Sequence, residues 1–306
     1  MNHKFLYLIL KLLISCTVIY FVFKQIKINN YFYYFQENFF DLKIIFYVLV
    51  LFFIINIIIA LRWYFIINYS KKNIPFIKVL RASLYSNIFT TLSIPTLADV
   101  SRVIFLKQDT VNKKELAVTV VIDRFIGLTS KIIYAIFVMF FLNLYLKIHF
   151  FNNYLYIFVF FLVILFLLFK FMNSNVIAKL FSKFKILKET IRSAKKNYNI
   201  KVFDFVCLAL FSLLIHFILA LLFYLICSQA NIPNIIIISL LSPILIIAGQ
   251  IPFFFGGWGI REITFISIFS FFSITSDISF SVSIYFGLIS TSFSFIFLMI
   301  WLFESF

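Results

Sequence analysis

The sequence is poor in acidic residues and contains few of the motifs that enzymes use, and each shortage excludes a class of protein. Its 306 residues include 11 aspartate and glutamate residues against 27 lysine and arginine residues. No mixed polar stretch reaches the roughly 50 residues that a soluble catalytic domain needs. The nucleophile elbow, the HExxH zinc motif and the Walker phosphate loop are also absent from the sequence. These absences favour a function that is not enzymatic.

Cysteine and histidine are too few and too scattered to form a redox or metal centre. The three cysteines are Cys16, Cys207 and Cys227, and all of them lie in apolar segments without the spacing of a ligand motif. The three histidines, His3, His149 and His216, are also far apart in sequence. We therefore expect no disulfide, no metal site and no cofactor.

Apolar residues dominate what is present. They make up 64% of the chain, and its mean hydropathy is +1.09, whereas soluble domains are about half apolar. A helix needs about 20 apolar residues to cross a hydrocarbon core of about 30 Å. The sequence predicts an all-α polytopic membrane protein that forms a single integral membrane domain over residues 1–306. Six segments are long enough to span: Phe5–Phe23, Ile44–Leu61, Phe125–Leu146, Tyr154–Met172, Phe203–Cys227 and Phe280–Phe303.

The basic residues predict the orientation of these spans. Residues 62–114 contain nine of them and residues 170–201 another nine, which is the bias of cytoplasmic loops in the positive-inside rule. We expect both termini in the cytoplasm and the protein in a bacterial inner (plasma) membrane. Anionic lipid is the expected partner of the basic loops, and nucleic acid is not. The basic linker 173–201 is either an amphipathic surface helix or a plain solvated connector.

Two regions do not fit a simple crossing. Residues 81–106 are moderately apolar, broken at Pro95 and flanked by basic residues on both sides, which is typical of a re-entrant hairpin with both ends on one face. Residues 235–273 are apolar on both sides of a break at Pro252. Three of the chain's six glycines follow that proline, at Gly256, Gly257 and Gly259.

Opposed broken hairpins are the arrangement that inverted repeats produce in transporters. In membranes, irregular backbone occurs where protein or a water-filled cavity covers it. Both hairpins are therefore expected to line a polar cavity. One alternative stays open for the second hairpin, in which Ile235–Phe254 crosses fully and Arg261 lies at the cytoplasmic interface.

Charged residues that border apolar sequence are the candidate site. A charge inside a membrane is costly, so it is a functional hypothesis by default. The planar guanidinium of arginine suits phosphate groups, which it can contact through two hydrogen bonds. The alternative for every candidate is an ion pair that fixes helix packing and touches no substrate. The candidates are Arg62, the pair Asp99 and Arg102, the pair Asp123 and Arg124, and the pair Arg261 and Glu262.

The spacing of these residues predicts some of their partners. Asp99 and Arg102 are three residues apart and share one face of a helix. Adjacent residues such as Asp123 and Arg124 point apart, so each needs a different partner, and Arg124 with Asp99 is one testable pairing. Two further polar residues of the apolar spans, Lys131 and His216, are interpreted as packing or snorkelling residues.

Together the motifs resemble the lysylphosphatidylglycerol synthase transmembrane family, also called flippase-like proteins. They occur in the family's order, and the Asp-Arg-x-x-Gly-Leu and Gly-x-Arg-Glu pieces are the most specific. Glycines before the hairpin acid are usual in the family, and Pro95–Asp99 contains none. The motifs are Ala60-Leu61-Arg62-Trp63, Ile94-Pro95 to Arg102, Asp123-Arg124-Phe125-Ile126-Gly127-Leu128 and Gly256-Gly257-Trp258-Gly259-Ile260-Arg261-Glu262.

The resemblance implies translocation of a lipid with a polar or phosphate-bearing headgroup between leaflets, in envelope lipid or glycolipid biogenesis. We expect a stand-alone membrane domain without the aminoacyl-transferase domain of bifunctional relatives. The lipid is expected to be anionic or linked to isoprenoid phosphate. Two alternatives stay open: a membrane-embedded transferase that uses Asp99 or Asp123 as a base, and a scaffold that binds envelope biosynthesis enzymes.

Overall fold

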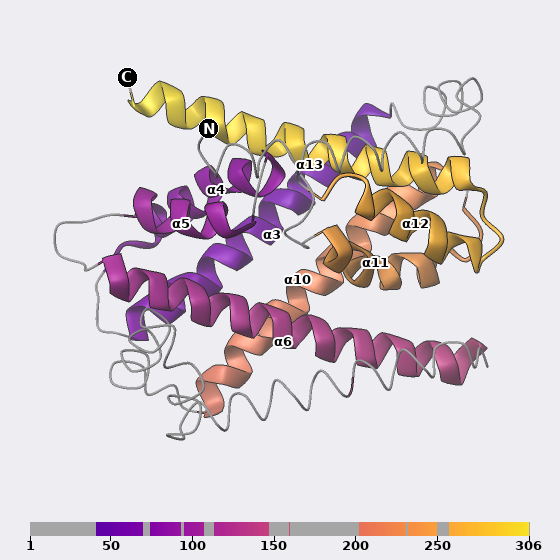
Figure 1. The fold of residues 1–306 in the computed structure, drawn as a ribbon, viewed down its shortest axis with the longest axis horizontal. Coiled ribbons are helices and arrows are strands. Elements are labelled where there is room, and N and C mark those ends of the chain that lie inside the picture. The colour runs from indigo at the N-terminus through magenta and orange to yellow at the C-terminus, as the bar shows by residue number, and fades with distance from the viewer. Residues whose placement is uncertain are drawn as a thin grey trace, which may run out of the picture. The chain divides into compact units, whose positions relative to one another are not determined.

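The computed structural model describes residues 41–69, 74–92, 95–106, 113–146, 159, 202–230, 232–249 and 257–305. Every regular element in these ranges is a helix, as the coloured ribbons of Figure 1 show. The expected all-α architecture is therefore confirmed. The expected span Phe5–Phe23 and the linker 173–201 lie outside the described residues, and so does the expected span Tyr154–Met172 apart from residue 159.

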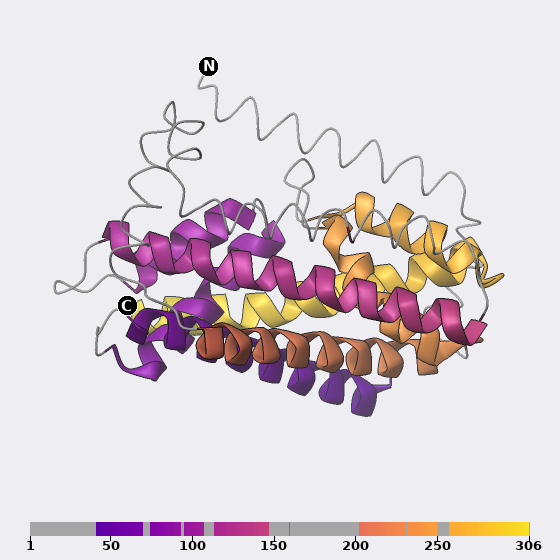
Figure 2. The same cartoon turned by 90° about the horizontal axis from the view of Figure 1, so that it is seen from below.

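Four of the described helices are long and apolar enough to cross a membrane. Each contains one of the expected spans. The helix α6 begins well before Phe125, where the expected span began. Its first three turns were missed because they carry polar residues, which a search for apolar sequence passes over. Figure 2 shows α6 as one unbroken helix. The four are α3 (Leu42–Tyr69), α6 (Lys113–Leu146), α10 (Val202–Gln229) and α13 (Ser276–Ser305).

Each region that was expected to form a broken hairpin contains two short helices. The first has α4 (Phe76–Leu92) and α5 (Pro95–Phe105). Pro95 begins α5, where its missing N–H breaks no helical hydrogen bond. The second region has α11 (Ile235–Gly249) and α12 (Ile260–Ser270). At 1.5 Å per residue, α11 is roughly 22 Å long, which is short of the hydrocarbon thickness.

The helix α11 continues through a proline because a serine replaces the lost hydrogen bond. Pro243 lies inside the helix and has no N–H to donate to the carbonyl of Ser239. The hydroxyl of Ser242 donates to that same carbonyl at 2.6 Å. An apolar helix therefore passes the proline without leaving a buried carbonyl unsatisfied.

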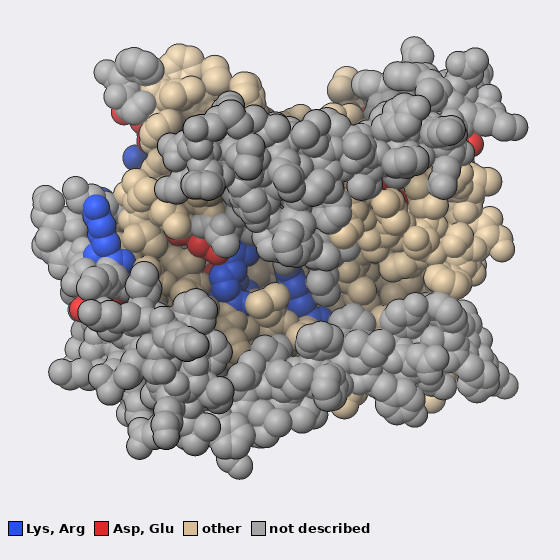
Figure 3. Space-filling view, viewed as in Figure 1, with Lys and Arg blue, Asp and Glu red and all other residues tan. Residues whose placement is uncertain are grey.

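The chain divides into two compact units. The first comprises residues 1–55, 84–101 and 217–306, and the second comprises residues 56–83 and 102–216. Large apolar side chains are exposed on all four long helices. In the space-filling view of Figure 3, charged side chains interrupt the described surface in only a few places. Such a surface is suited to contact with lipid tails.

Aromatic rings form much of the core of the first unit. Phe223 of α10 packs against Phe265 of α12 at 5.6 Å and against Phe286 of α13 at 4.8 Å between ring centroids. Phe52 of α3 contacts Phe286 at 5.6 Å. In this unit α12 packs against both α11 and α13. Three serines of α13 are fully buried and allow close helix approach: Ser279, Ser281 and Ser283.

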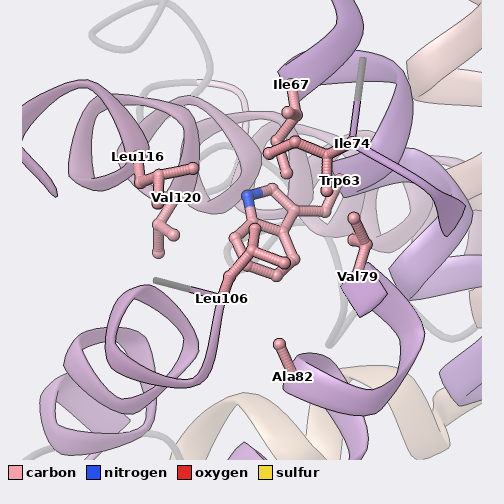
Figure 4. Close-up of a cluster of buried hydrophobic side chains, with 8 residues drawn as sticks. All are labelled: Trp63, Ile67, Ile74, Val79, Ala82, Leu106, Leu116 and Val120. Carbon is pink, nitrogen blue, oxygen red and sulfur yellow. The ribbon is translucent and has the colours of Figure 1, made fainter. Parts of the chain in front are cut away.

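Trp63 is at the centre of the core of the second unit (Figure 4). Its indole is completely buried among apolar side chains of α3, α4 and α6. Its Nε1 donates to the hydroxyl of Thr119 on α6 at 2.9 Å. One side chain thus joins α3 to α6 by packing and by a hydrogen bond. The surrounding cluster is Ile67, Ile74, Val79, Ala82, Leu106, Leu116 and Val120.

Replacing this tryptophan tests its part in the core. Trp63→Ala removes the hydrogen bond and leaves a cavity, which we expect to lower the free energy of unfolding by about 3 kcal/mol. The melting temperature of the detergent-solubilised protein should fall by several degrees. Phe46→Ala removes an exposed ring on the same helix and should leave the melting temperature nearly unchanged. Equal melting temperatures for the two variants would contradict the assignment.

Candidate functional site

Three of the expected charged residues meet in the second unit around one carboxylate. The Nε of Arg62 on α3 donates to Oδ1 of Asp123 on α6 at 2.6 Å. The Nη1 of Arg102 on α5 donates to Oδ2 of the same carboxylate at 3.4 Å. All three side chains are buried, and that of Asp123 is 1% exposed. We call these three residues the Asp123 centre.

A serine and a glycine complete the surroundings of Arg62. Its Nη1 donates to the hydroxyl of Ser212 on α10 at 2.7 Å. Gly127 lies one turn after Asp123 on α6, and a Cβ there would be 3.3 Å from Nη2 of Arg62. The guanidinium therefore lies against bare backbone. Arg102 lies over the ring of Trp63, with 5.8 Å between Cζ and the ring centroid.

A second centre lies at the start of α12, in the first unit. Nε and Nη2 of Arg261 both donate to Oε1 of Glu262, at 3.2 and 2.8 Å. Nε also donates to the hydroxyl of Ser283 on α13 at 3.2 Å, and this hydroxyl is 3.2 Å from Oε1. The Glu262 side chain is 1% exposed. We call these three residues the Glu262 centre.

Two glycines with positive φ set up this centre. Gly257 has φ 76° and Gly259 has φ 91°, a region that side chains disfavour. The turn that they form presents the N–H of Gly259 to Oε2 of Glu262. Glu262 thus satisfies an N–H that the first turn of a helix leaves without an intrahelical partner.

Aromatic rings and a third glycine enclose the guanidinium of Arg261. It lies 4.6 Å from the ring centroid of Trp258 and 5.8 Å from that of Phe286. Gly287 of α13 is so close that a Cβ would collide with Nη2 and would be 3.0 Å from both Cζ of Arg261 and the Trp258 ring. The arginine can occupy this position only because residue 287 is glycine.

The two centres are built from the same kinds of parts. Each contains a buried arginine and a buried carboxylate. In each, a long helix supplies a serine hydroxyl and a long helix supplies a glycine. A tryptophan lies beside a guanidinium in both. Such a set is expensive inside an apolar segment unless the charges are paired. The described residues contain no group of three metal-ligating side chains.

The structure brings some of the sequence candidates together and leaves others as predictions. Arg62 and Arg102 share Asp123, a grouping that the sequence did not predict. Arg261 and Glu262, which are adjacent in sequence, form an ion pair with each other. Asp99 and Arg124 are half-buried, and their pairing stays a prediction. Pro252 and Gly256 lie outside the described residues, whereas Pro95, Gly257 and Gly259 begin or precede helices as described above.

Sequence reasoning missed the serines and glycines that hold the arginines. Ser212 is 150 positions from Arg62, and nothing in a lone serine of an apolar span marks it. Gly127 and Gly287 carried a signal, because glycine is rare in this chain and both lie inside long helices. His216 is also buried, and its Nε2 lies 3.3 Å from the hydroxyl of Ser130.

Comparison with known proteins decides the family. A family model described as the lysylphosphatidylglycerol synthase TM region matches residues 8–301. The chain belongs to this family. The family match covers both centres and confirms the resemblance carried by the sequence motifs. No curated protein and no solved structure matched the chain.

Family membership and the apolar helices together make this an integral membrane protein tied to lipid or envelope biogenesis. The family's motifs now have structural meaning in this chain. The Asp-Arg-x-x-Gly-Leu piece supplies the carboxylate of the Asp123 centre and the glycine beside Arg62. The Gly-x-Arg-Glu piece supplies the turn and both charges of the Glu262 centre.

Neutralising the shared carboxylate tests the Asp123 centre. Asp123→Asn leaves two buried guanidinium groups facing an amide, and removing one partner of a buried ion pair costs about 3–5 kcal/mol. We expect a clear fall in melting temperature. Asp41→Asn is the matched control, because Asp41 is exposed and caps the backbone N–H of Lys43, which asparagine does equally well. Equal melting temperatures for both variants would refute the centre.

Adding one methyl group tests the position of Arg261. A helical Gly→Ala change stabilises by up to about 1 kcal/mol where it fits, yet we expect Gly287→Ala to lower the melting temperature because the new Cβ displaces the guanidinium. In an Arg261→Ala background the same change should be neutral or stabilising. A fall of the same size in both backgrounds would show that the collision is not with Arg261.

Proposed function

We propose that the protein translocates a lipid with a polar or phosphate-bearing headgroup between membrane leaflets, as a flippase-like protein of a bacterial inner membrane. The observation that carries the proposal is the pair of buried arginine and carboxylate centres inside apolar helices. Charge inside a membrane is costly, and in membrane proteins it marks substrate or ion pathways. Arginine is the side chain that best matches a phosphate.

The geometry favours binding over catalysis. Both oxygens of Asp123 accept hydrogen bonds from arginines, and both oxygens of Glu262 accept hydrogen bonds within the Glu262 centre. A general base needs a carboxylate oxygen that is within reach of a substrate proton. These carboxylates instead position guanidinium groups, as a headgroup site requires. The arginines are the proposed contacts, and anionic or isoprenoid-phosphate-linked lipids are the proposed partners.

Reconstituted liposomes test the function. Purified protein should increase the rate at which fluorescent phosphatidylglycerol reaches the outer leaflet, measured by dithionite quenching. We expect Arg62→Ala and Arg261→Ala to lower this rate about tenfold, the equilibrium equivalent of one charge-assisted hydrogen bond. Lys78→Ala removes an exposed cation of α4 and should leave the rate unchanged.

The outcomes separate function from site. If the wild-type protein moves labelled lipid no faster than empty liposomes, translocation is wrong. If translocation is present but both arginine variants match the wild type, the centres are structural ion pairs. Variants should be compared only when they elute as single species from size-exclusion chromatography, so that misfolding is not read as loss of transport.

A further inference from the structure

His216 is a titratable side chain that the proposed function does not use. It lies on α10 and is 3% exposed, and its Nδ1 has no hydrogen-bond partner among the described residues. It is near the middle of the candidate membrane span Val206–Gln229, so roughly 15 Å of hydrocarbon separates it from either interface. A buried polar atom without a partner is costly in such surroundings. Packing alone, the interpretation from sequence, does not account for this atom.

The contacts of the imidazole define which nitrogen carries the hydrogen. Nε2 of His216 lies 3.3 Å from the hydroxyl of Ser130 on α6. That hydroxyl has one hydrogen and donates it to the carbonyl of Gly127 at 2.9 Å, so it accepts a hydrogen from Nε2. The ring of Tyr134, also on α6, holds the imidazole from one side, with 5.4 Å between ring centroids. A proton that reaches the imidazole must therefore bind at Nδ1.

Two cations act on this imidazole. Arg62 donates to Ser212, which lies one turn before His216 on α10. Lys131 lies on α6, near the middle of the candidate span Glu115–Leu144. The charges of Lys131 and Arg62 both interact with His216. Like charges repel, so a proton on Nδ1 requires a negative charge nearby that offsets them.

The Asp123 centre leaves an excess of positive charge in this region. Its carboxylate is shared by two guanidinium groups, so two positive charges face one negative charge. Lys131 interacts electrostatically with Arg62 and Arg124, which have the same sign as Lys131 itself. An anion that enters the region offsets this excess and makes a proton on His216 favourable. Binding of the anion and binding of the proton are therefore linked, and each strengthens the other.

We propose that His216 is a proton-binding site that couples lipid movement to a proton gradient. Nδ1 takes a proton from water on one face of the membrane when an anionic headgroup is bound. It returns the proton to water on the other face when the headgroup leaves, so that the two cross together as an electrically neutral pair. This assignment rests on the proposed translocation and adds its energy source. Lys131 sets the coupling, because its charge opposes the proton until the headgroup offsets it.

Nitrogen NMR of the full chain in lipid bilayers tests the proton site. The chain has three histidines, so isotope labelling of histidine gives few signals, and His216→Gln identifies that of His216 by its absence. In phosphatidylcholine, at a pH of about 6.5, where free histidine is half protonated, we expect the neutral form with hydrogen on Nε2. In phosphatidylglycerol at the same pH we expect the imidazolium. The other two histidines report the general effect of a negative surface.

A pH gradient across liposomes tests the coupling. The interior is made about one pH unit more acidic than the outside. Fluorescent phosphatidylglycerol should then accumulate in the outer leaflet, up to about tenfold over the inner leaflet for one proton per lipid. Dithionite quenching at steady state measures the leaflet ratio, and empty liposomes under the same gradient give the background. A membrane potential set with potassium and valinomycin should not change the ratio, because the proton and the headgroup together are neutral.

Three variants decide whether His216 carries the proton. His216→Gln keeps a donor for Ser130 but binds no proton, so the leaflet ratio should fall to its value at equal pH. Lys131→Met removes one opposing cation and should shrink the difference between the His216 signals in the two lipids. Lys78→Gln removes an exposed cation of α4 and should change neither result. Equal His216 signals in both lipids, or a full leaflet ratio in His216→Gln, would overturn the proposal.

The same measurements distinguish this inference from the proposed function. Translocation at equal pH without a response to the gradient refutes the coupling and leaves the function standing. A lipid-dependent proton on His216 without translocation supports the proton site and refutes translocation. If His216→Gln does not translocate lipid at equal pH, the spectra of the wild-type protein still decide, because they require no transport.

Discussion

The carboxylate of Asp123 is the contact on which the second unit depends. It accepts from Arg62 on α3 and Arg102 on α5, so one group on α6 fixes two other helices. Trp63, which follows Arg62 on α3, donates to Thr119, which lies one turn before Asp123 on α6. Two adjacent residues of α3 are therefore matched to two positions one turn apart on α6. A shift of either helix along its axis would break the ion pair and the indole hydrogen bond together, which fixes the register of the helices.

The Glu262 centre meets a different requirement, which is to begin a helix in apolar surroundings. The first N–H groups of a helix have no intrahelical acceptor, and within a bilayer no water replaces one. Glu262 accepts the N–H of Gly259 with one oxygen and the guanidinium of Arg261 with the other. The positive φ of Gly259 makes the first contact possible. In this motif the charged side chain and the irregular backbone therefore depend on each other, because the carboxylate of Glu262 accepts the N–H that the glycine turn presents.

The sequence was sufficient to predict the long helices and to select most charged residues of the two centres as candidates. Both follow from the local composition of the chain. Apolar runs predicted the long helices, and Pro95 together with the glycines before Arg261 predicted where helices break. The grouping of Arg62 and Arg102 on Asp123 could not be predicted, because those contacts join three helices. Ser212 and Ser283 were missed for the same reason. Gly127 and Gly287 matter because the missing Cβ lets a guanidinium lie against the backbone, and only the position of that guanidinium shows this.

Stability alone does not account for the buried charges. Replacing a buried ion pair by well-packed apolar residues of similar volume is often neutral or stabilising, so helices this apolar have a simpler way to pack. Arg62 is instead held by Asp123 and Ser212 and lies against the bare backbone of Gly127. Charges that are this costly to bury in apolar helices are therefore consistent with the proposed headgroup site.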